Sequence, residues 1–120
     1  MIGEFVILRS RDDGVKCGWL ISLLPQPGGL ACGVLREARQ IHHWQQNNEN
    51  YTLVELSNDG VIPPATARIS APSENPITML GICGVYPCTE RAAINLSQSR
   101  WNAPFKPSPS PLPRKNSTGS

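Results

Sequence analysis

Residues 36–44 read Arg-Glu-Ala-Arg-Gln-Ile-His-His-Trp, and whether this stretch is a helix or a strand decides the fold of the chain. A helix would place Ile41 and Trp44 on one face, whereas an extended segment points successive side chains to opposite faces. The stretch directly follows Leu30–Leu35, an apolar run typical of a strand. We therefore favour a continuation of that strand with a bulge, which makes the middle of the chain part of a sheet.

Two earlier apolar runs predict a hairpin ahead of this strand. Phe5–Leu8 and Val15–Leu24 flank the turn at residues 12–14, Asp-Asp-Gly, whose glycine supplies the positive φ that a tight turn needs. The second strand is expected to end at Pro25 because proline has no N–H to donate to a ladder. Together with Leu30–Leu35, these consecutive strands predict an antiparallel meander.

A first helix is predicted after a polar loop at residues 45–51. Thr52 and Glu55 have the spacing of a capping box, in which the threonine hydroxyl accepts from a backbone N–H and the glutamate reaches back to the cap. The helix is expected to end at Gly60, because glycine is the commonest residue just past a helix C-terminus.

Two further strands and a second helix complete the expected elements. Residues 67–71 and 77–86 are predicted strands, and the glycines inside the second one indicate a bulge or a close backbone approach. Thr89 is a suitable N-cap for a final helix that ends near Arg100. The expected fold class is α+β: an antiparallel β-sheet of about five strands with one short helix and a C-terminal helix.

The end of the chain differs in composition from the rest. Five of the twelve prolines fall within residues 104–113, alternating with serines, and large apolar side chains are sparse there. Such a segment buries too little surface to offset the entropy lost on ordering. We predict a single domain at residues 1–103 and a disordered Pro/Ser-rich tail at residues 104–120.

Charge and hydropathy argue against several classes of partner. Three of the eleven basic residues lie in the tail, so residues 1–103 carry eight basic against nine acidic side chains. A duplex-DNA reader normally shows a basic face on its folded part, so no DNA partner is expected. No apolar run has the length of a membrane span, and no signal peptide is recognised. The default expectation is a cytoplasmic protein without a membrane partner.

Cysteine and histidine spacing predicts neither a metal site nor a catalytic centre. The four cysteines contain no Cys-x-x-Cys pair, so reduced and mostly buried thiols are expected. His42 and His43 are adjacent and would point to opposite sides of a strand, so at most one could activate a thiol. No nucleophile elbow, phosphate-cradling glycine loop or carboxylate pair is present. We expect no enzyme activity, no metal and no cofactor.

A small-molecule or nucleotide site is the function that the residue types favour most. A nucleotide needs a flat apolar surface for its base and guanidinium groups for its phosphates. A single arginine on a strand more often faces water, and a single tryptophan more often lies in the core. The evidence for a ligand site is therefore that both residue types occur together on one short element. The candidate guanidinium groups and rings are Arg36, Arg39, Arg68, Trp44, Trp19 and Tyr86.

Short islands of this sequence resemble a family of small phage and prophage proteins that includes the anti-Thoeris sponge proteins. The resemblance covers residues 4–102. Its most specific islands are Ala-Arg-x-Ile-x-x-Trp at residues 38–44 and Pro-Cys-Thr-Glu at residues 87–90. The remaining islands are Phe5–Arg9, Asp12–Gly18, Thr52–Leu56, Arg68–Ser70 and Arg100-Trp101.

The resemblance implies a phage counter-defence protein that sequesters a cyclic nucleotide signal of bacterial immunity, of the cyclic ADP-ribose type or a cyclic oligonucleotide. It implies a homodimer or higher homo-oligomer in the cytoplasm of the host bacterium. The expected ligand-binding residues are Arg39, Trp44 and Arg68, followed by Arg36 and His43.

Two positions depart from the pattern of that family. The family usually has two successive arginines where this chain has Arg39-Gln40, and aromatic residues where it has His42-His43. If these positions line the pocket, ligand preference differs or binding is lost. The alternative function from another class is a phage accessory protein that acts as a protein-interaction module on a host target, with the tail as its contact. A structural phage accessory protein is the third hypothesis.

Overall fold

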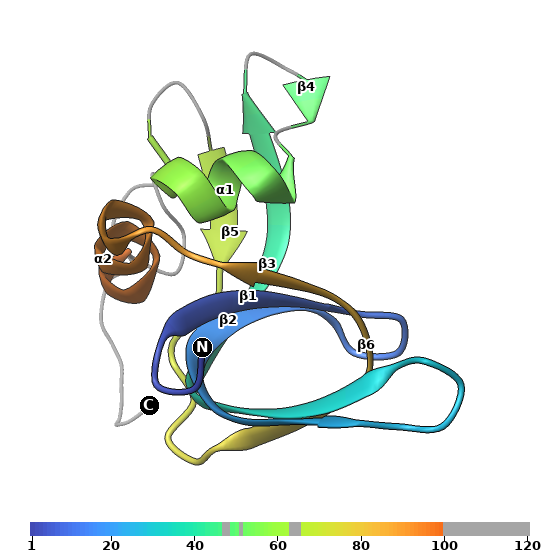
Figure 1. Cartoon of the computed structure of the whole chain (residues 1–120). Helices are drawn as coiled ribbons and strands as arrows, with labels where there is room; N and C mark the ends of the chain where they lie inside the picture. The colour runs from blue at the N-terminus through green and yellow to red at the C-terminus, as the bar shows by residue number, and fades with distance from the viewer. Residues whose placement is uncertain (47–48, 51, 63–65, 100–120) are drawn as a thin grey trace.

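The computed structural model describes residues 1–46, 49–50, 52–62 and 66–99. The predicted tail at residues 104–120 and the expected helix end near Arg100 lie outside these ranges. The described elements follow the predicted α+β order (Figure 1). They are β1 Phe5–Ser10, β2 Gly14–Pro25, β3 Ala31–Gln46, β4 Glu49–Asn50, α1 Leu53–Asp59, β5 Thr66–Ile69, β6 Ile77–Pro87 and α2 Glu90–Gln98.

Four of the strands close into a small antiparallel barrel. β1 pairs with β2 and β6, and β3 pairs with β6 and also with β2, so that the path β2-β1-β6-β3 returns to its start. Figure 1 shows these strands as a ring, with both helices on one side of it. The predicted meander of β1, β2 and β3 is therefore present, and β6 completes the barrel between β1 and β3.

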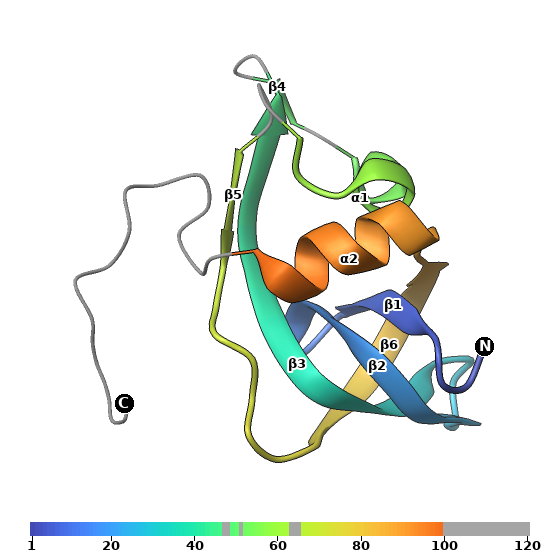
Figure 2. The same cartoon turned by 90° about the vertical axis from the view of Figure 1, so that its left-hand side faces the viewer.

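The long strand β3 belongs to the barrel in its first half and leaves it in its second half (Figure 2). The later residues pair with β5, for example Ile41 with Ile69, and with the two-residue strand β4. The predicted strand continuation through residues 36–44 is confirmed. The predicted loop at residues 45–51 is wrong in part, because backbone pairing of Gln45 with Asn50 and of Gln46 with Glu49 forms a hairpin that side-chain polarity does not reveal.

A bulge in β3 lets both Leu35 and Ala38 face the barrel interior. Between the pairs Cys17–Arg39 and Trp19–Arg36, two residues of β3 oppose one residue of β2. Without this extra residue, side chains three positions apart would point to opposite faces of a strand. The bulge also turns Arg39 towards the helices.

Two hydrophobic cores lie on the two sides of β1. Val6 and Leu8 point into the barrel, and Phe5 and Ile7 point towards the helices. Burial of each such side chain contributes about 1.5–3 kcal/mol. The barrel core consists of Val6, Leu8, Leu20, Leu35, Ala38, Met79 and Ile82. The core under the helices consists of Phe5, Ile7, Cys17, Ile41, Leu56, Val61, Ala67, Ile69 and Leu96.

Both predicted helix starts are confirmed. Thr52 and Glu55 form the capping box of α1, and the Thr89 hydroxyl accepts from the backbone N–H of Ala92 at the start of α2. Asn95 joins α2 to the chain just after α1, because its amide accepts from the backbone N–H of Val61 and donates to the Val61 carbonyl. Neither helix has the length or hydrophobicity needed to span a bilayer, within the described residues.

Candidate functional site

Arg39, the first expected ligand-binding residue, is buried and holds the end of α2. Its side chain is directed to the helix side of β3, and the residue is only 3% exposed. Nε donates to the Ser70 carbonyl at 2.8 Å, Nη1 donates to the Leu96 carbonyl at 2.8 Å, and Nη2 donates to the Ser99 carbonyl. Leu96 belongs to the last turn of α2 and Ser99 is its C-cap, and a cation at this end of a helix is favoured by the helix dipole.

The electrostatic surroundings of Arg39 support this structural role. Desolvation lowers the pKa of its guanidinium, while the neighbouring Cys17 thiol acts in the opposite direction. Burial raises the pKa of Cys17 to about 12, and Arg39 counteracts part of that rise. The three peptide carbonyls therefore supply the polar environment that a buried guanidinium requires. They also engage three of its five N–H groups, and burial keeps the whole guanidinium away from a ligand in solution.

Arg68 does not share a face of the sheet with Arg39, and Trp44 packs against the core under the helices. Ala67 and Ile69 are buried and Arg68 between them is exposed, so Arg68 lies on the outer face of β5. Trp44 pairs with Ala67 and packs half-buried against the core under the helices. His43 pairs with Arg68 through the backbone, and its side chain lies outside what the structure describes.

A cleft of about 480 Å³ opens between the N-terminal segment and α2. Its volume is in the range of small-molecule sites. Trp19 from β2 and Phe5 from β1 form its aromatic part, with ring centroids 5.1 Å apart and planes at 81°. The lining residues are Gly3, Glu4, Phe5, Trp19, Cys88, Glu90, Ala93, Ile94, Ser97 and Gln98.

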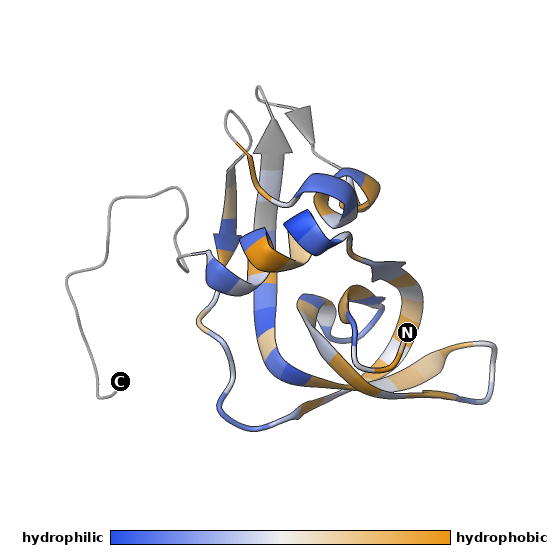
Figure 3. Cartoon of the chain, turned by 60° about the vertical axis from the view of Figure 1, so that its left-hand side comes forward, coloured by the Kyte–Doolittle hydropathy of each residue, from blue (hydrophilic) through white to orange (hydrophobic). Residues whose placement is uncertain are grey.

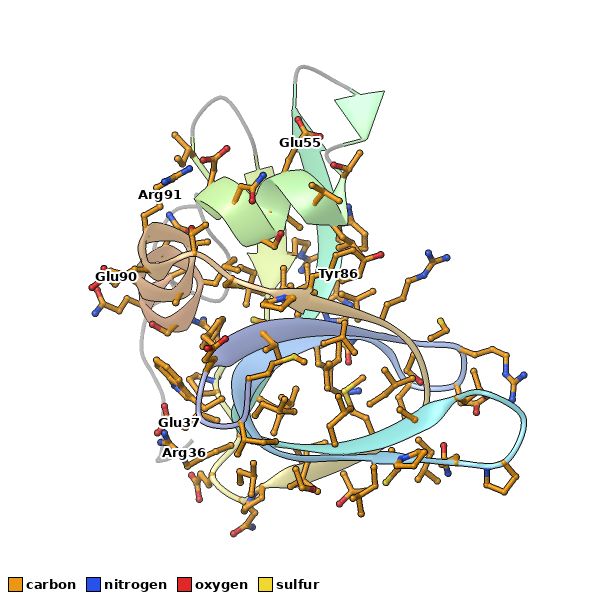
Figure 4. The ribbon with its side chains drawn as sticks, in the orientation of Figure 1. Arg36, Glu37, Glu55, Tyr86, Glu90 and Arg91 are labelled. Carbon is orange, nitrogen blue, oxygen red and sulfur yellow. The ribbon has the colours of Figure 1, made fainter. Side chains whose placement is uncertain are left out.

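Arg36 is the expected site residue that the structure brings to this cleft. Its guanidinium carbon lies 5.8 Å from the ring centroid of Trp19, within the range of a cation–π contact. Nη1 also donates to the Glu37 carboxylate at 2.9 Å. Figure 4 shows the two side chains together on the outside of the barrel. The Arg36 side chain is 54% exposed, so a ligand in solution can reach it.

The charged residues that line the cleft itself are both acidic. Glu4 precedes β1, and Glu90 is in the first turn of α2, and both are exposed. Figure 4 shows Glu90 on the outer side of its helix. Burial raises the pKa of the Cys88 thiol, also in the lining, to about 12, so it carries little of the reactive thiolate at neutral pH. The cleft thus combines aromatic and apolar surface with negative charge, and Arg36 adds a positive charge beside Trp19.

Sequence reasoning named Arg36 and Trp19 but missed the rest of this cleft. Its N-terminal residues and those of α2 are separated by more than eighty positions in the chain, and no local pattern links them. Hydropathy gives a partial signal, because Ile94 is apolar but lies off the helix face that carries Ala92 and Leu96. The structure leaves Ile94 51% exposed, whereas Ala92 and Leu96 are buried. Figure 3 shows this mixture of hydrophobic and hydrophilic residues along α2.

Groups of three or more histidine, cysteine or acidic side chains that could hold a metal ion are absent from the described residues. No curated protein and no solved structure matches the chain. A family model described as "Domain of unknown function (DUF6948)" matches residues 3–96, which include the barrel and most of α2. The chain therefore belongs to the DUF6948 family.

Proposed function

We propose that this protein is a phage counter-defence protein that binds a cyclic nucleotide immune signal in the cytoplasm of the host bacterium. The signal is of the cyclic ADP-ribose type or a cyclic oligonucleotide. Binding withholds it from its effector, and no covalent bond of the ligand is made or broken. The islands at residues 38–44 and 87–90 support the proposal through their resemblance to the anti-Thoeris sponge family.

The observation that carries the proposal is the contact between Arg36 and Trp19 beside the cleft. An indole offers a nucleobase a stacking surface, and a guanidinium offers a phosphate parallel N–H donors in a fixed geometry. The cleft has room for a small planar ligand next to both groups. Trp19 would stack the base, and Arg36 would exchange its contact with Glu37 for the phosphate.

The other expected residues take different roles in this proposal. Arg39 acts as a positioning residue, because its bonds to Leu96 and Ser99 hold the helix that forms one wall of the cleft. Arg68 lies on the exposed outer face of β5, outside the lining of the cleft, so in this proposal it contacts the ligand of a second copy, whereas Trp44 packs against the core under the helices. A homodimer, in which two chains enclose the ligand, is therefore part of the proposal.

Affinity gives an independent reason for the dimer. Sequestration of a signalling molecule needs a dissociation constant near 1 nM, or about −12 kcal/mol. Stacking on one aromatic ring supplies about 1–3 kcal/mol, and a charge-assisted contact between one guanidinium and a phosphate adds about 1.5–3 kcal/mol. One chain therefore falls short, and a second set of contacts is needed.

The decisive experiment measures thermal unfolding and calorimetric binding with a panel of cyclic ADP-ribose isomers and cyclic oligonucleotides. The proposal predicts a rise in Tm with at least one compound and release of the intact ligand on heating. Sedimentation should report a dimer. No thermal shift with any compound of the panel would contradict the proposal.

A matched pair of variants locates the site. Arg36→Gln should weaken binding at least about tenfold, because it removes a charge-assisted phosphate contact. Arg91→Gln is the control, because Arg91 is also an exposed arginine in an ion pair, with Asp59, and faces α1 instead of the cleft. Equal binding by both variants and the parent protein would show that the ligand does not bind beside Trp19.

The second candidate function is the protein-interaction module. The acidic lining of the cleft favours it, because Glu4 and Glu90 attract a basic peptide and repel a phosphate. A pull-down from host lysate with the full chain and with the Glu4→Gln/Glu90→Gln variant separates the two candidates. Loss of a captured host protein in the variant, together with no response to nucleotides, would favour the interaction module.

A further inference from the structure

The cleft has the surface chemistry of a site for a basic, proline-rich peptide. The half-buried Trp19, which packs edge-on against the buried Phe5, provides aromatic surface on which proline rings pack well, and Ala93 and Ile94 extend it with aliphatic groups. Glu4 and Glu90 supply two carboxylates at its lining. Aromatic grooves of this kind recognise extended proline-rich segments, because such segments lose little conformational entropy on binding.

The chain itself contains a segment of complementary chemistry. Residues 104–115 read Pro-Phe-Lys-Pro-Ser-Pro-Ser-Pro-Leu-Pro-Arg-Lys. Five of these residues are prolines and three are basic, whereas residues 100–120 contain no aspartate or glutamate. The negative charge of the cleft and the positive charge of this segment are thus complementary.

The cleft lies where that segment begins. α2 ends at Gln98, and both Gln98 and Ser97 line the cleft. Five residues, 99–103, separate this wall from Pro104. A short connection of this kind gives an effective concentration in the millimolar range. An intrinsic dissociation constant near 1 mM therefore suffices for about half occupancy, which a few proline–aromatic contacts and exposed charge pairs can supply.

We propose that residues 104–115 bind in the cleft between the N-terminal segment and α2 of the same chain, as an extended proline-rich ligand. The prolines pack on Trp19, and the basic side chains Lys106, Arg114 and Lys115 approach the carboxylates of Glu4 and Glu90. This inference does not depend on nucleotide binding.

Nuclear magnetic resonance of the full chain tests the proposal without any added ligand. The reporters are the Trp19 indole N–H and the backbone amides of Gly3, Ala93 and Gln98, which border the cleft. The test variant is Lys106→Glu/Arg114→Glu/Lys115→Glu, and the control Lys106→Arg/Lys115→Arg keeps the charge. Amides of Leu8 and Leu35 in the barrel core report that the fold is unchanged.

The proposal predicts that the charge-reversal variant shifts the four reporters, while the charge-keeping control leaves them in place. In the parent protein, salt near 1 M should shift the reporters in the same direction, because the Debye length is then about 3 Å. If the four reporter signals have the same chemical shifts in the parent protein, the charge-reversal variant and the control at low salt, the proposal is overturned. Chemical shifts that change with protein concentration would also overturn it, because they would show that the tail binds in the cleft of a second copy.

Discussion

Gly18 of β2 lies opposite Glu37 at the bulge of β3, and Glu37 is the one non-glycine residue of the described chain with a positive φ, at 55°. A Cβ on Gly18 would lie 2.9 Å from the Arg36 carbonyl oxygen and 3.2 Å from the Cα of Ala38. The two strands thus approach so closely that only glycine fits on one side. The other side carries the backbone strain, next to the arginine that contacts Trp19.

Glu37→Gly should raise the free energy of unfolding by about 0.5–1 kcal/mol, because glycine adopts a positive φ without strain. The lost ion pair with Arg36 is half-exposed and contributes little. Denaturant titration gives the comparison. Glu37→Ala is the control: it removes the same carboxylate and keeps the strain, so it should not stabilise. Equal effects of the two variants would show that φ is not the cause.

Arg39→Met should lower the free energy of unfolding by about 2–4 kcal/mol. The change leaves the Ser70, Leu96 and Ser99 carbonyls without their charged donor, and charge-assisted bonds in buried places are costly to lose. Urea unfolding measures the effect. Arg91→Met, on the exposed side of α2, should stay within about 0.5 kcal/mol of the parent protein. A comparably small loss for Arg39→Met would refute its role as the support of α2.

Asn95→Ala should lower the free energy of unfolding by about 1–3 kcal/mol, because both bonds between its amide and the Val61 backbone disappear. Hydrogen exchange offers a site-specific readout: the Val61 amide should lose protection, while barrel amides such as Leu8 keep theirs. Ser97→Ala, also on α2, serves as the control. Unchanged protection at Val61 would show that another contact holds the two helices together.

Acid should weaken the start of α1. The Thr52 backbone N–H and hydroxyl donate to the Glu55 carboxylate and hold its pKa below the ordinary 4.5. The folded state thus binds this proton less readily than the unfolded state. The contribution is present above about pH 4.5 and is lost as the pH falls through the lowered pKa.

Glu55→Gln keeps a capping box and removes the titration, so its Tm should fall less between neutral and acid pH than that of the parent protein. Circular dichroism melts across that range provide the measurement. Glu74→Gln removes an exposed carboxylate from the segment before β6 and should follow the parent protein. Parallel pH curves for Glu55→Gln and the parent protein would contradict the expected role of the carboxylate.

The cysteines should differ widely in reactivity. Burial raises the pKa of Cys17 and of Cys88 to about 12, so almost no thiolate is present at neutral pH, whereas Cys83 is exposed on β6. Mass spectrometry after brief alkylation of the native protein should find Cys83 labelled first and Cys17 last. Denaturant should abolish the difference. Early labelling of Cys17 would indicate opening of the core under the helices.

Local patterns predicted the elements, whereas the pairing of distant segments could not be predicted. The capping box at Thr52 and the strand through residues 36–44 follow from residues close in sequence. Closure of the barrel depends on the pairing of β1 with β6, for example of Val6 with Pro87. These residues are far apart in the sequence, so no local pattern predicts their contact.

The candidate site shows the same division. Arg36 and Trp19 were identified by residue type, because a guanidinium and an indole have the chemistry of a nucleotide site wherever they are exposed. Arg39 has the same chemistry, and only the three-dimensional structure shows that it is buried and bonded to peptide carbonyls at the end of α2. Residue type therefore selects candidates, and the tertiary environment decides which of them a ligand can reach.

The position of β6 in the ring has a consequence for synthesis on the ribosome. β1 and β3 both pair with a strand that ends at Pro87, so the nascent chain cannot close its barrel until most of the protein has been translated. Until then the first three strands form an open sheet, whose outer edges keep unpaired backbone groups. Nascent chains that stop before residue 77 should therefore be the ones most prone to aggregation and most dependent on chaperones.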